Sequence, residues 1–336
     1  MNAEAPDTQA GGNPADDLVS VVIPTRNRWP LLSRALASVL GQEDVDLEVI
    51  VVDEGSSDET PERLAAIDDE RVRSLRNDEP TGVARARNRG IGEARGEWVA
   101  FLDDDDFWAP AKLRSQLDAC AAAGADFSYT GLVTTDPSLG RRRVSSPFPA
   151  AGLERTILDM NVVGPPSSVI ARSPLLAEVG GFDPEVSILA DWDMWIRLAT
   201  AAPAAACDEP LTGYLAHSEN MHLDAPAAIE EFRRLRVKHA ALAESLGVRI
   251  GGERWYSWIA SSLRRSGHPF RASGLFVWVA LRWRRPGLLA RAAGTLAGER
   301  VVARVRRLRP APEDVSEVAG AARWVDAFAT APEPLR

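Results

Sequence analysis

The chain has 336 residues, enough for one large domain or two modest ones, and its 45% apolar content is ordinary for a globular protein with a sizeable core. The formal net charge is −9, and the two cysteines, Cys120 and Cys207, match neither a disulfide framework nor a zinc site, which fits a reducing cytosol. No run of eighteen uncharged apolar residues occurs, so the sequence predicts no membrane-spanning helix.

The first seventeen residues are polar and acidic and are rich in glycine, proline and alanine. They lack the basic start and the apolar stretch of a signal peptide or anchor. This composition predicts a disordered tail over residues 1–17.

From residue 18 onward, strand patterns alternate with helix patterns. Leu18–Ile23 is a β-branched run that stops at Pro24, and Trp29–Leu40 carries apolar residues at helical spacing before Gly41. The same alternation predicts further strands over 47–52, 71–75 and 97–102 and helices over 58–67 and 81–94. The order predicts an α/β fold with a mainly parallel sheet flanked by helices, in which ligands bind beyond the carboxyl ends of the strands.

Polar clusters follow three of these strands: Pro24–Arg28, Asp53–Asp58 and Asp103–Asp106. Four adjacent carboxylates repel one another, so the last cluster indicates a site for a divalent cation. The alternative is a solvated acidic turn that caps a helix starting near Pro110. Three such clusters on one edge of a sheet favour a single binding site.

Five motifs occur in the order VSVVIPTRNR, LEVIVVDEGSSDET, GVARARNRGIGEARGEWVAFLDDDDFWAPAKL, GGFDPEV and ADWDMWIRLA. Between Leu18 and His222 the chain thereby resembles the family 2 inverting glycosyltransferases, which have the GT-A fold. The resemblance implies a metal-dependent hexosyltransferase that moves a sugar from a nucleotide-diphosphate sugar, with UDP-sugars favoured, to a hydroxyl acceptor in a single displacement.

The resemblance also implies a metal site for Mn or Mg in the aspartate run. Asp105 is the expected metal ligand, and Asp104 is expected on the donor ribose or on a metal-bound water. Because the register of four consecutive acids is open by one, Asp103 and Asp106 are alternative ligands or simple caps. His217 is a further candidate near the metal, against the alternative of a hydrogen-bonded structural histidine.

For the donor, the resemblance implies a pocket rim formed at the first strand end, a hydrogen bond from the base to Asp53, and a second acid, Glu54, where the family more often has Asp. On the helix over 81–94, Arg85 or Asn88 is expected to face the donor, unless this helix carries only a solvent-facing basic stripe. The expected donor-binding residues are Pro24, Thr25, Asn27, Asp53, Glu54, Arg85, Asn88 and Asp104.

The acceptor side carries the expected general base. The family pattern places this carboxylate at Asp191, with Asp193 as the rival, while Ala190 replaces the first acid of the family's pair. Trp192 and Trp195 beside them either stack on a sugar or belong to the core.

The C-terminal third reads as helices over 229–246, 255–265, 271–284 and 287–307. Between Leu263 and Arg309 there are twelve arginines against the single acid Glu299. Interleaved with tryptophans, they allow a peripheral contact with an anionic membrane, or a helical region that packs its aromatics on the core. No recognised motif supports nucleic-acid binding.

The predicted organisation is a tail (1–17), a GT-A domain (18–225, with a nucleotide-sugar-binding half at 18–106 and an acceptor half at 107–225), a helical accessory region (226–310) and a tail (311–336). The expected acceptor is a saccharide, a lipid-linked or a small molecule in bacterial cell-surface glycan synthesis, in the cytoplasm or at the inner face of the membrane. Two rival functions are a non-catalytic nucleotide-sugar-binding protein and a sugar-nucleotide pyrophosphorylase.

Overall fold

The computed structural model describes residues 18–136, 141–215, 225–297 and 324–329. The tail predicted at 1–17 and the candidate ligand His217 lie outside these residues, and so does the predicted helix beyond residue 297. The described strands are β1 (Val19–Thr25), β2 (Leu47–Asp53), β3 (Val72–Arg76), β4 (Trp98–Phe101), β5 (Phe107–Trp108), β6 (Phe127–Asp136), β7 (Arg141–Ser145), β8 (Val169–Arg172) and β9 (Ala204–Leu215).

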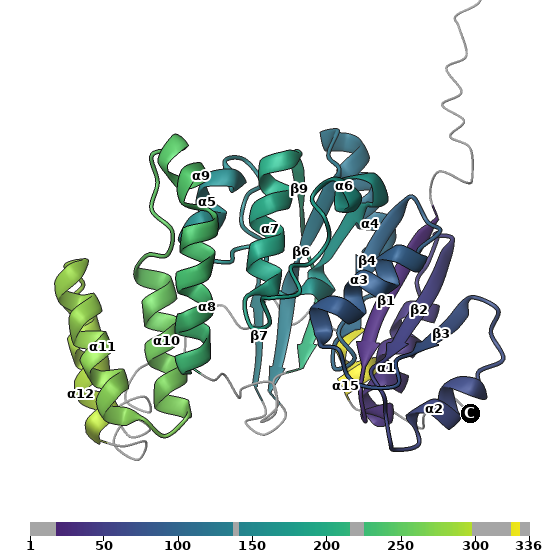
Figure 1. Cartoon of the computed structure of the whole chain (residues 1–336), viewed down its shortest axis with the longest axis horizontal. Helices are drawn as coiled ribbons and strands as arrows, with labels where there is room; N and C mark the ends of the chain where they lie inside the picture. The colour runs from purple at the N-terminus through teal and green to yellow at the C-terminus, as the bar shows by residue number, and fades with distance from the viewer. Residues whose placement is uncertain (1–17, 137–140, 216–224, 298–323, 330–336) are drawn as a thin grey trace, which may run out of the picture.

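Helices alternate with the first four strands and dominate the last third of the chain (Figure 1). The described helices are α1 (Trp29–Leu40), α2 (Thr60–Ala65), α3 (Val83–Glu93), α4 (Lys112–Ala123), α5 (Leu153–Asp159), α6 (Ser173–Glu178), α7 (Ala190–Ala201), α8 (Ala225–Lys238), α9 (Ala240–Ser245), α10 (Glu253–Arg265), α11 (Pro269–Arg282), α12 (Gly287–Ala297), α15 (Trp324–Ala329) and a 3-10 turn at Pro166–Ser168.

One nine-stranded sheet runs in the order β3-β2-β1-β4-β8-β6-β9-β5, with β7 paired to β6. Strands β1 to β4 are parallel, which confirms the predicted parallel sheet for the first half of the domain. The second half is mixed, because β8 runs antiparallel to both β4 and β6. Thr25 stands opposite Asp53 in the β1–β2 register, so the polar clusters that follow these strands meet at one edge.

The hydrophobic core lies on both faces of this sheet. Val21 and Ile23 of β1 pack with α1 and α4, whereas Val22 faces α3 and α7, as the two-residue period of a strand requires. All three side chains are fully buried. Burying a side chain of this size contributes about 1.5–3 kcal/mol, so the two faces together stabilise the sheet strongly.

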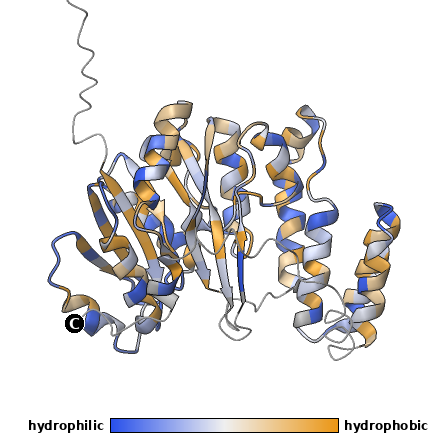
Figure 2. Ribbon diagram, turned by 180° about the vertical axis from the view of Figure 1, so that it is seen from behind, coloured by the Kyte–Doolittle hydropathy of each residue, from blue (hydrophilic) through white to orange (hydrophobic). Residues whose placement is uncertain are grey.

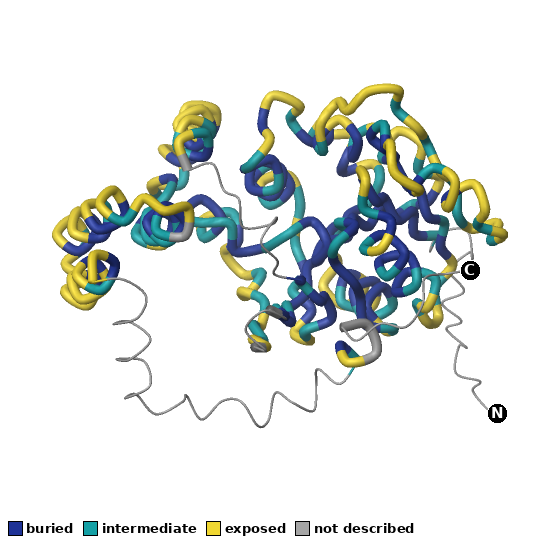
Figure 3. Tube along the Cα trace, turned by 90° about the horizontal axis from the view of Figure 1, so that it is seen from below, coloured by how far each residue is buried: buried dark blue, intermediate teal, exposed yellow. Residues whose placement is uncertain are grey.

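The accessory helices share this core. Phe232 of α8 and Trp255 and Ile259 of α10 belong to the same buried cluster as Trp192 of α7, so the apolar packing runs across the predicted boundary at residue 225. Helices α11 and α12 lie at the end of the molecule farthest from β3 (Figure 1) and show exposed outer faces (Figure 3).

One predicted helix is wrong in its extent. The single helix expected over 229–246 is two helices, α8 and α9, which are separated at His239. Among the described residues, no helix is both long enough and apolar enough to cross a membrane.

Candidate active site

The carboxyl ends of β1, β2 and β4 surround a pocket of about 480 Å³, here called the acidic pocket. Its position agrees with the edge predicted from the three polar clusters. The lining residues are Pro24, Thr25, Arg26, Arg28, Glu54, Pro80, Gly82, Val83, Arg87, Asp103, Asp104 and Asp105.

Asp104 and Asp105 share one cationic neighbour in this pocket. The Arg28 guanidinium Nη1 lies 3.3 Å from an oxygen of Asp104 and 3.2 Å from an oxygen of Asp105. The Thr25 hydroxyl donates a hydrogen bond of 2.7 Å to Asp104. Burial and the neighbouring charge of Asp105 nevertheless raise the pKa of Asp104 to about 7. The pocket therefore carries negative charge that further positive charge would stabilise.

The donor set fits a divalent metal that is shared with a bound diphosphate. Among the described residues no group of three His, Cys, Asp or Glu side chains is placed to hold a metal ion. Magnesium, however, needs only one or two protein carboxylates when substrate phosphates and waters complete its shell. Asp104 and Asp105, which already converge on one cation, supply two such carboxylates.

The other two aspartates of the run have different surroundings. Asp103 forms an ion pair with Arg87, whose side chain is buried. Asp106 is 1% exposed and accepts hydrogen bonds from the Ser167 hydroxyl at 2.5 Å and the Leu215 N–H at 3.4 Å. Burial and the charge of Asp105 raise the pKa of Asp106 well above its usual range. Asp106 thus joins β9 to the 3-10 turn and does not line the acidic pocket.

The two acids at the end of β2, Asp53 and Glu54, are buried and hydrogen-bonded. Asp53 forms an ion pair with Arg76 and accepts the Ser56 N–H at 2.9 Å. Glu54 accepts the backbone N–H groups of Thr81 and Gly82, each at 2.7 Å. The longer side chain of Glu54 reaches the start of α3, which gives a structural reason for glutamate at this position.

Two predicted ligand-binding residues are engaged elsewhere. Asn27 accepts the backbone N–H groups of Ser57 at 2.7 Å and Asp58 at 3.3 Å, and so tethers the loop after β2. Asn88 exchanges two hydrogen bonds of 2.7 Å with the backbone of Phe182. Both side chains stabilise loops, and neither lines the acidic pocket.

On α3 the charged residue that lines the acidic pocket is Arg87, whereas Arg85 or Asn88 was expected there. The Arg85 side chain is 52% exposed and lies 3.4 Å from Glu185. Arg87 lines the acidic pocket, and its guanidinium lies 5.2 Å from the centre of the Phe182 ring. The sequence prediction also missed Arg28, although it lies within the first polar cluster.

Asp191 lines a second pocket, of about 330 Å³, here called the Asp191 pocket. One of its oxygens accepts the Asn161 side-chain amide at 2.9 Å and the other accepts the Trp192 N–H at 2.7 Å. The remaining lining residues are Leu132, Thr134, Met160, Gly164, Pro165, Ile188, Leu189, Tyr214, Trp255 and Trp258.

Burial raises the pKa of Asp191 to about 6. The positive charge of Arg87 lowers this pKa and the negative charge of Asp103 raises it. Both of these residues line the acidic pocket, so the charges of that pocket act on Asp191.

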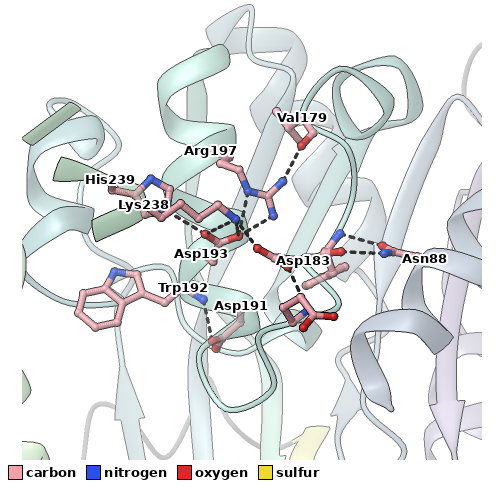
Figure 4. Close-up of polar contacts among 11 residues, drawn as sticks. Asn88, Val179, Asp183, Asp191, Trp192, Asp193, Arg197, Lys238 and His239 are labelled. Carbon is pink, nitrogen blue, oxygen red and sulfur yellow. Dashed lines mark hydrogen bonds and ion pairs between the residues drawn. The ribbon is translucent and has the colours of Figure 1, made fainter. Parts of the chain in front are cut away.

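Asp193 is the centre of an ion cluster between α7 and α8 (Figure 4). Its fully buried carboxylate lies 2.8 Å from Arg197, 2.9 Å from Lys238 and 2.8 Å from the His239 Nε2. Burial alone would raise its pKa, but the hydrogen bond to His239 and the charges of Arg197 and Lys238 hold the pKa at about 2. This carboxylate is saturated with partners and lines neither the acidic pocket nor the Asp191 pocket.

The two tryptophans beside these acids belong to the core. Trp192 stacks on Phe232 with ring centres 5.7 Å apart, and its indole N–H donates to the Ile157 carbonyl at 2.6 Å. Trp195 is fully buried and donates to the Gly164 carbonyl at 3.0 Å. The accessory helices contribute two aromatic side chains to the Asp191 pocket, Trp255 and Trp258. Of these, Trp258 is partly exposed.

Comparison with known proteins gives a consistent result. A family model described as "Glycosyl transferase family 2" matches residues 20–172. The succinoglycan biosynthesis protein ExoO of Rhizobium meliloti is 32% identical over 248 residues, which cover 68% of this chain and 71% of ExoO. The Escherichia coli UDP-Glc:alpha-D-GlcNAc-diphosphoundecaprenol beta-1,3-glucosyltransferase WfgD is 36% identical over 114 residues, 34% of this chain and 45% of WfgD.

Solved structures show the same fold at low sequence identity. Staphylococcus aureus TarS 1-349 in complex with UDP-GlcNAc aligns with a TM-score of 0.56 and 19% identity, over 82% of this chain and 79% of that one. At this identity the likeness concerns the fold alone, a curled mixed sheet flanked by helices.

Proposed function

The chain belongs to glycosyltransferase family 2, and from this we propose that it transfers a sugar from a UDP-sugar to a hydroxyl acceptor with inversion at the anomeric carbon. The observation that carries the proposal is that a buried carboxylate, Asp191, feels the charges of the acidic pocket. Asp191, a carboxylate with a pKa near 6, lies within the electrostatic reach of Arg87 and Asp103 at the acidic pocket. A base beside a donor site is what a single displacement requires.

In this proposal the acidic pocket holds the donor. Asp53, which pairs with Arg76 and is not among the residues that line the pocket, would accept a hydrogen bond from the base, and Thr25 with Asp104 would face the ribose. Asp105, with Asp104 beside it, would hold Mn or Mg, which supplies charge neutralisation to the departing diphosphate. Arg87 adds a fixed positive charge at the same pocket. The name of WfgD, a UDP-Glc-dependent glucosyltransferase, supports the choice of nucleotide.

The Asp191 pocket would hold the acceptor. Asn161 and the Trp192 N–H fix both oxygens of Asp191, so its carboxylate is oriented to take the proton of the attacking hydroxyl. The wall formed by Tyr214 and Trp258 offers flat surfaces to a sugar ring.

The names of the relatives support an acceptor in bacterial polysaccharide synthesis. ExoO is named for succinoglycan biosynthesis, and the acceptor in the name of WfgD is a diphosphoundecaprenol-linked sugar. We therefore extend the proposal to a lipid-linked acceptor and to a peripheral contact of the basic C-terminal helices with the membrane. Nucleic acid has no part in it.

The first test is Asp191→Asn. We expect transfer to fall by about 100-fold or more, the scale of a lost general base, while UDP affinity measured by calorimetry stays unchanged. Asp118→Asn, on the exposed face of α4, is the matched control and should leave both quantities unchanged.

Transfer that survives in Asp191→Asn would remove the base assignment. Tight UDP binding by the wild-type protein without transfer to any acceptor would instead favour a binding protein, which the replacement of an acid by Ala190 also allows. A pyrophosphorylase is disfavoured because the β1 loop, Pro24–Arg28, has no glycine-rich phosphate-binding sequence.

A further inference from the structure

A cavity of about 510 Å³ lies among the accessory helices, away from both pockets of the candidate active site. Trp255 and Tyr256 are consecutive on α10, yet Trp255 lines the Asp191 pocket and Tyr256 lines this cavity, so the two spaces lie on different sides of α10. Six side chains give the cavity its chemistry: Arg236, Arg249, Arg282, Tyr256, Trp278 and Trp283. We call it the basic-aromatic cavity.

Its positive charge is not neutralised by the described part of the protein. Arg236, Arg249 and Arg282 are all exposed, and within the described residues none of them forms an ion pair. Glu244 is the one acid in the lining. Three guanidinium groups against one carboxylate leave a net positive site, and a guanidinium matches the geometry of a phosphate group well.

The aromatic side chains form a compact wall. The ring centres of Tyr256 and Trp278 are 5.0 Å apart, and those of Trp278 and Trp283 are 5.3 Å apart. Arg282 lies over the Trp283 ring at 5.3 Å. Trp278 is 45% exposed, so a large part of this apolar ring contacts water. Rings with one apolar and one polar end are typical of the interface between lipid and water.

The neighbouring helices continue this surface. On α11, Phe270 is 81% exposed and Leu281 is 71% exposed (Figure 2 shows the hydropathy of these helices). Residues 266–297 contain five arginines, of which Arg282 lines the cavity, and no aspartate or glutamate. The rest of the protein is strongly acidic, since the whole chain has a net charge of −9.

We infer that the basic-aromatic cavity binds the phosphate group of an anionic membrane lipid, while Phe270, Trp278 and Leu281 of α11 enter the interface beside it. Charge complementarity selects this occupant: an anionic bilayer offers phosphates to the arginines and acyl chains to the exposed apolar residues. The inference rests on the proposed function for the lipid-linked nature of the acceptor. It gives a function to a site on the far side of α10 from Asp191.

Sedimentation of the full chain with vesicles tests the inference. We expect binding to phosphatidylcholine vesicles that contain about one quarter phosphatidylglycerol and at least about tenfold weaker binding to pure phosphatidylcholine. The double variant Arg236→Glu/Arg282→Glu should lose about tenfold or more of the binding to anionic vesicles. Leu281→Asn should weaken vesicle binding but should leave calorimetric binding of inorganic diphosphate unchanged, because it removes apolar contact without a change in charge.

The matched control is Arg95→Glu/Arg155→Glu, which makes the same change in net charge at exposed positions outside the cavity and should bind vesicles like the wild type. Unchanged UDP affinity shows that each variant is folded. Equal loss in both double variants, or no binding of the wild type to anionic vesicles, overturns the inference. Diphosphate binding without vesicle binding also overturns it, in favour of a soluble phosphate ligand. Transfer to a soluble acceptor, assayed separately, reports on the proposed function independently of these outcomes.

Discussion

Asp191 and Asp193 stand two residues apart on α7, and their surroundings give them opposite properties. Asp191 has two neutral hydrogen-bond donors and a pKa raised to about 6, whereas Asp193 has three basic partners and a pKa held at about 2. A proton acceptor must be able to gain a proton near neutral pH, which Asp193 cannot. The contacts therefore support the acid-base role that we propose for Asp191 and a structural role for Asp193.

The pKa of Asp191 predicts the pH profile of transfer. The base works only when it is deprotonated, so turnover should be constant well above pH 6 and should fall about tenfold per pH unit below that value. The measurement is kcat against pH under saturating donor and acceptor. A profile with no acidic limb near pH 6 would contradict the assignment, provided that UDP affinity is constant over the same range.

Asp193→Asn should destabilise the protein by about 3–5 kcal/mol, because three basic groups would lose a buried partner. Unfolding in urea measures the difference. Asp118→Asn, which removes an exposed pair with Arg114, should cost less than about 1 kcal/mol.

The low pKa of Asp193 also predicts how the stability of the protein changes at acidic pH. The pKa of this carboxylate in the folded protein is below the usual 3.8, so ionised Asp193 stabilises the fold above about pH 4, and this contribution is lost as the pH falls toward 2. The stability of Asp193→Asn should accordingly change less than that of the wild type between pH 4 and 2. Parallel stability curves would show that the ion cluster contributes little.

At the scale of elements, α8 holds α7 at two points. In the middle of α8, Glu231 accepts the backbone N–H groups of Ser187 at 3.1 Å, Ile188 at 2.8 Å and Leu189 at 3.0 Å, just before α7 begins. Two turns later, Lys238 and His239 bind Asp193. An accessory helix thus fixes the segment that carries the proposed base.

Glu231→Gln should lower kcat by about tenfold and leave UDP affinity unchanged, because an amide NH2 would face backbone donors and release the start of α7. Glu230→Gln is the matched control, since its carboxylate pairs only with arginines on the exposed face of α8 in the described structure. Restored turnover in Glu231→Asp would support positioning. A fall in UDP affinity in Glu231→Gln would point to a general loss of structure instead.

The elements that sequence predicted well are those with a strong local pattern. The β-branched runs of β1 and β2 are such local features. Gly180 and Gly181, in the motif GGFDPEV, have φ of +79° and +68°, a conformation that glycine adopts without steric cost. The break at His239 could not be predicted, because it accompanies a contact with Asp193, 46 residues away.

The site was predictable to a similar degree. The polar clusters at the strand ends contained Thr25, Asp53 and the aspartate run. The sequence did not show which of the four aspartates lines the pocket, because Asp106 is turned away by its hydrogen bonds to Ser167 and β9. Arg87 did leave a signal. Arg87 lies about one turn before Gly90. A Cβ atom at Gly90 would collide with Val22 of β1, so the face of α3 that carries Arg87 and Gly90 packs against the sheet.

At the scale of the whole molecule, the proposed metal links donor binding to stability. UDP with Mn at about 100 times its dissociation constant should stabilise the folded protein by about 2.7 kcal/mol and raise Tm, and a chelator should remove most of this effect. Asp105→Asn should abolish the metal-dependent part. Thermal shifts that are equal with Mn and with chelator would remove the metal from the proposal.

The buried cluster that joins Trp192 to Phe232 and Trp255 also bears on biosynthesis. A ribosome delivers β1 to β4 first, and these strands can pair as they emerge. On α7, Trp192 packs on Phe232 and Trp255, which lie 40 and more residues downstream, so this part of the helix surface stays uncovered until α8 and α10 leave the exit tunnel. We expect the donor half to fold early in synthesis, and the half that carries Asp191 to become competent only after α8 and α10 have been synthesised.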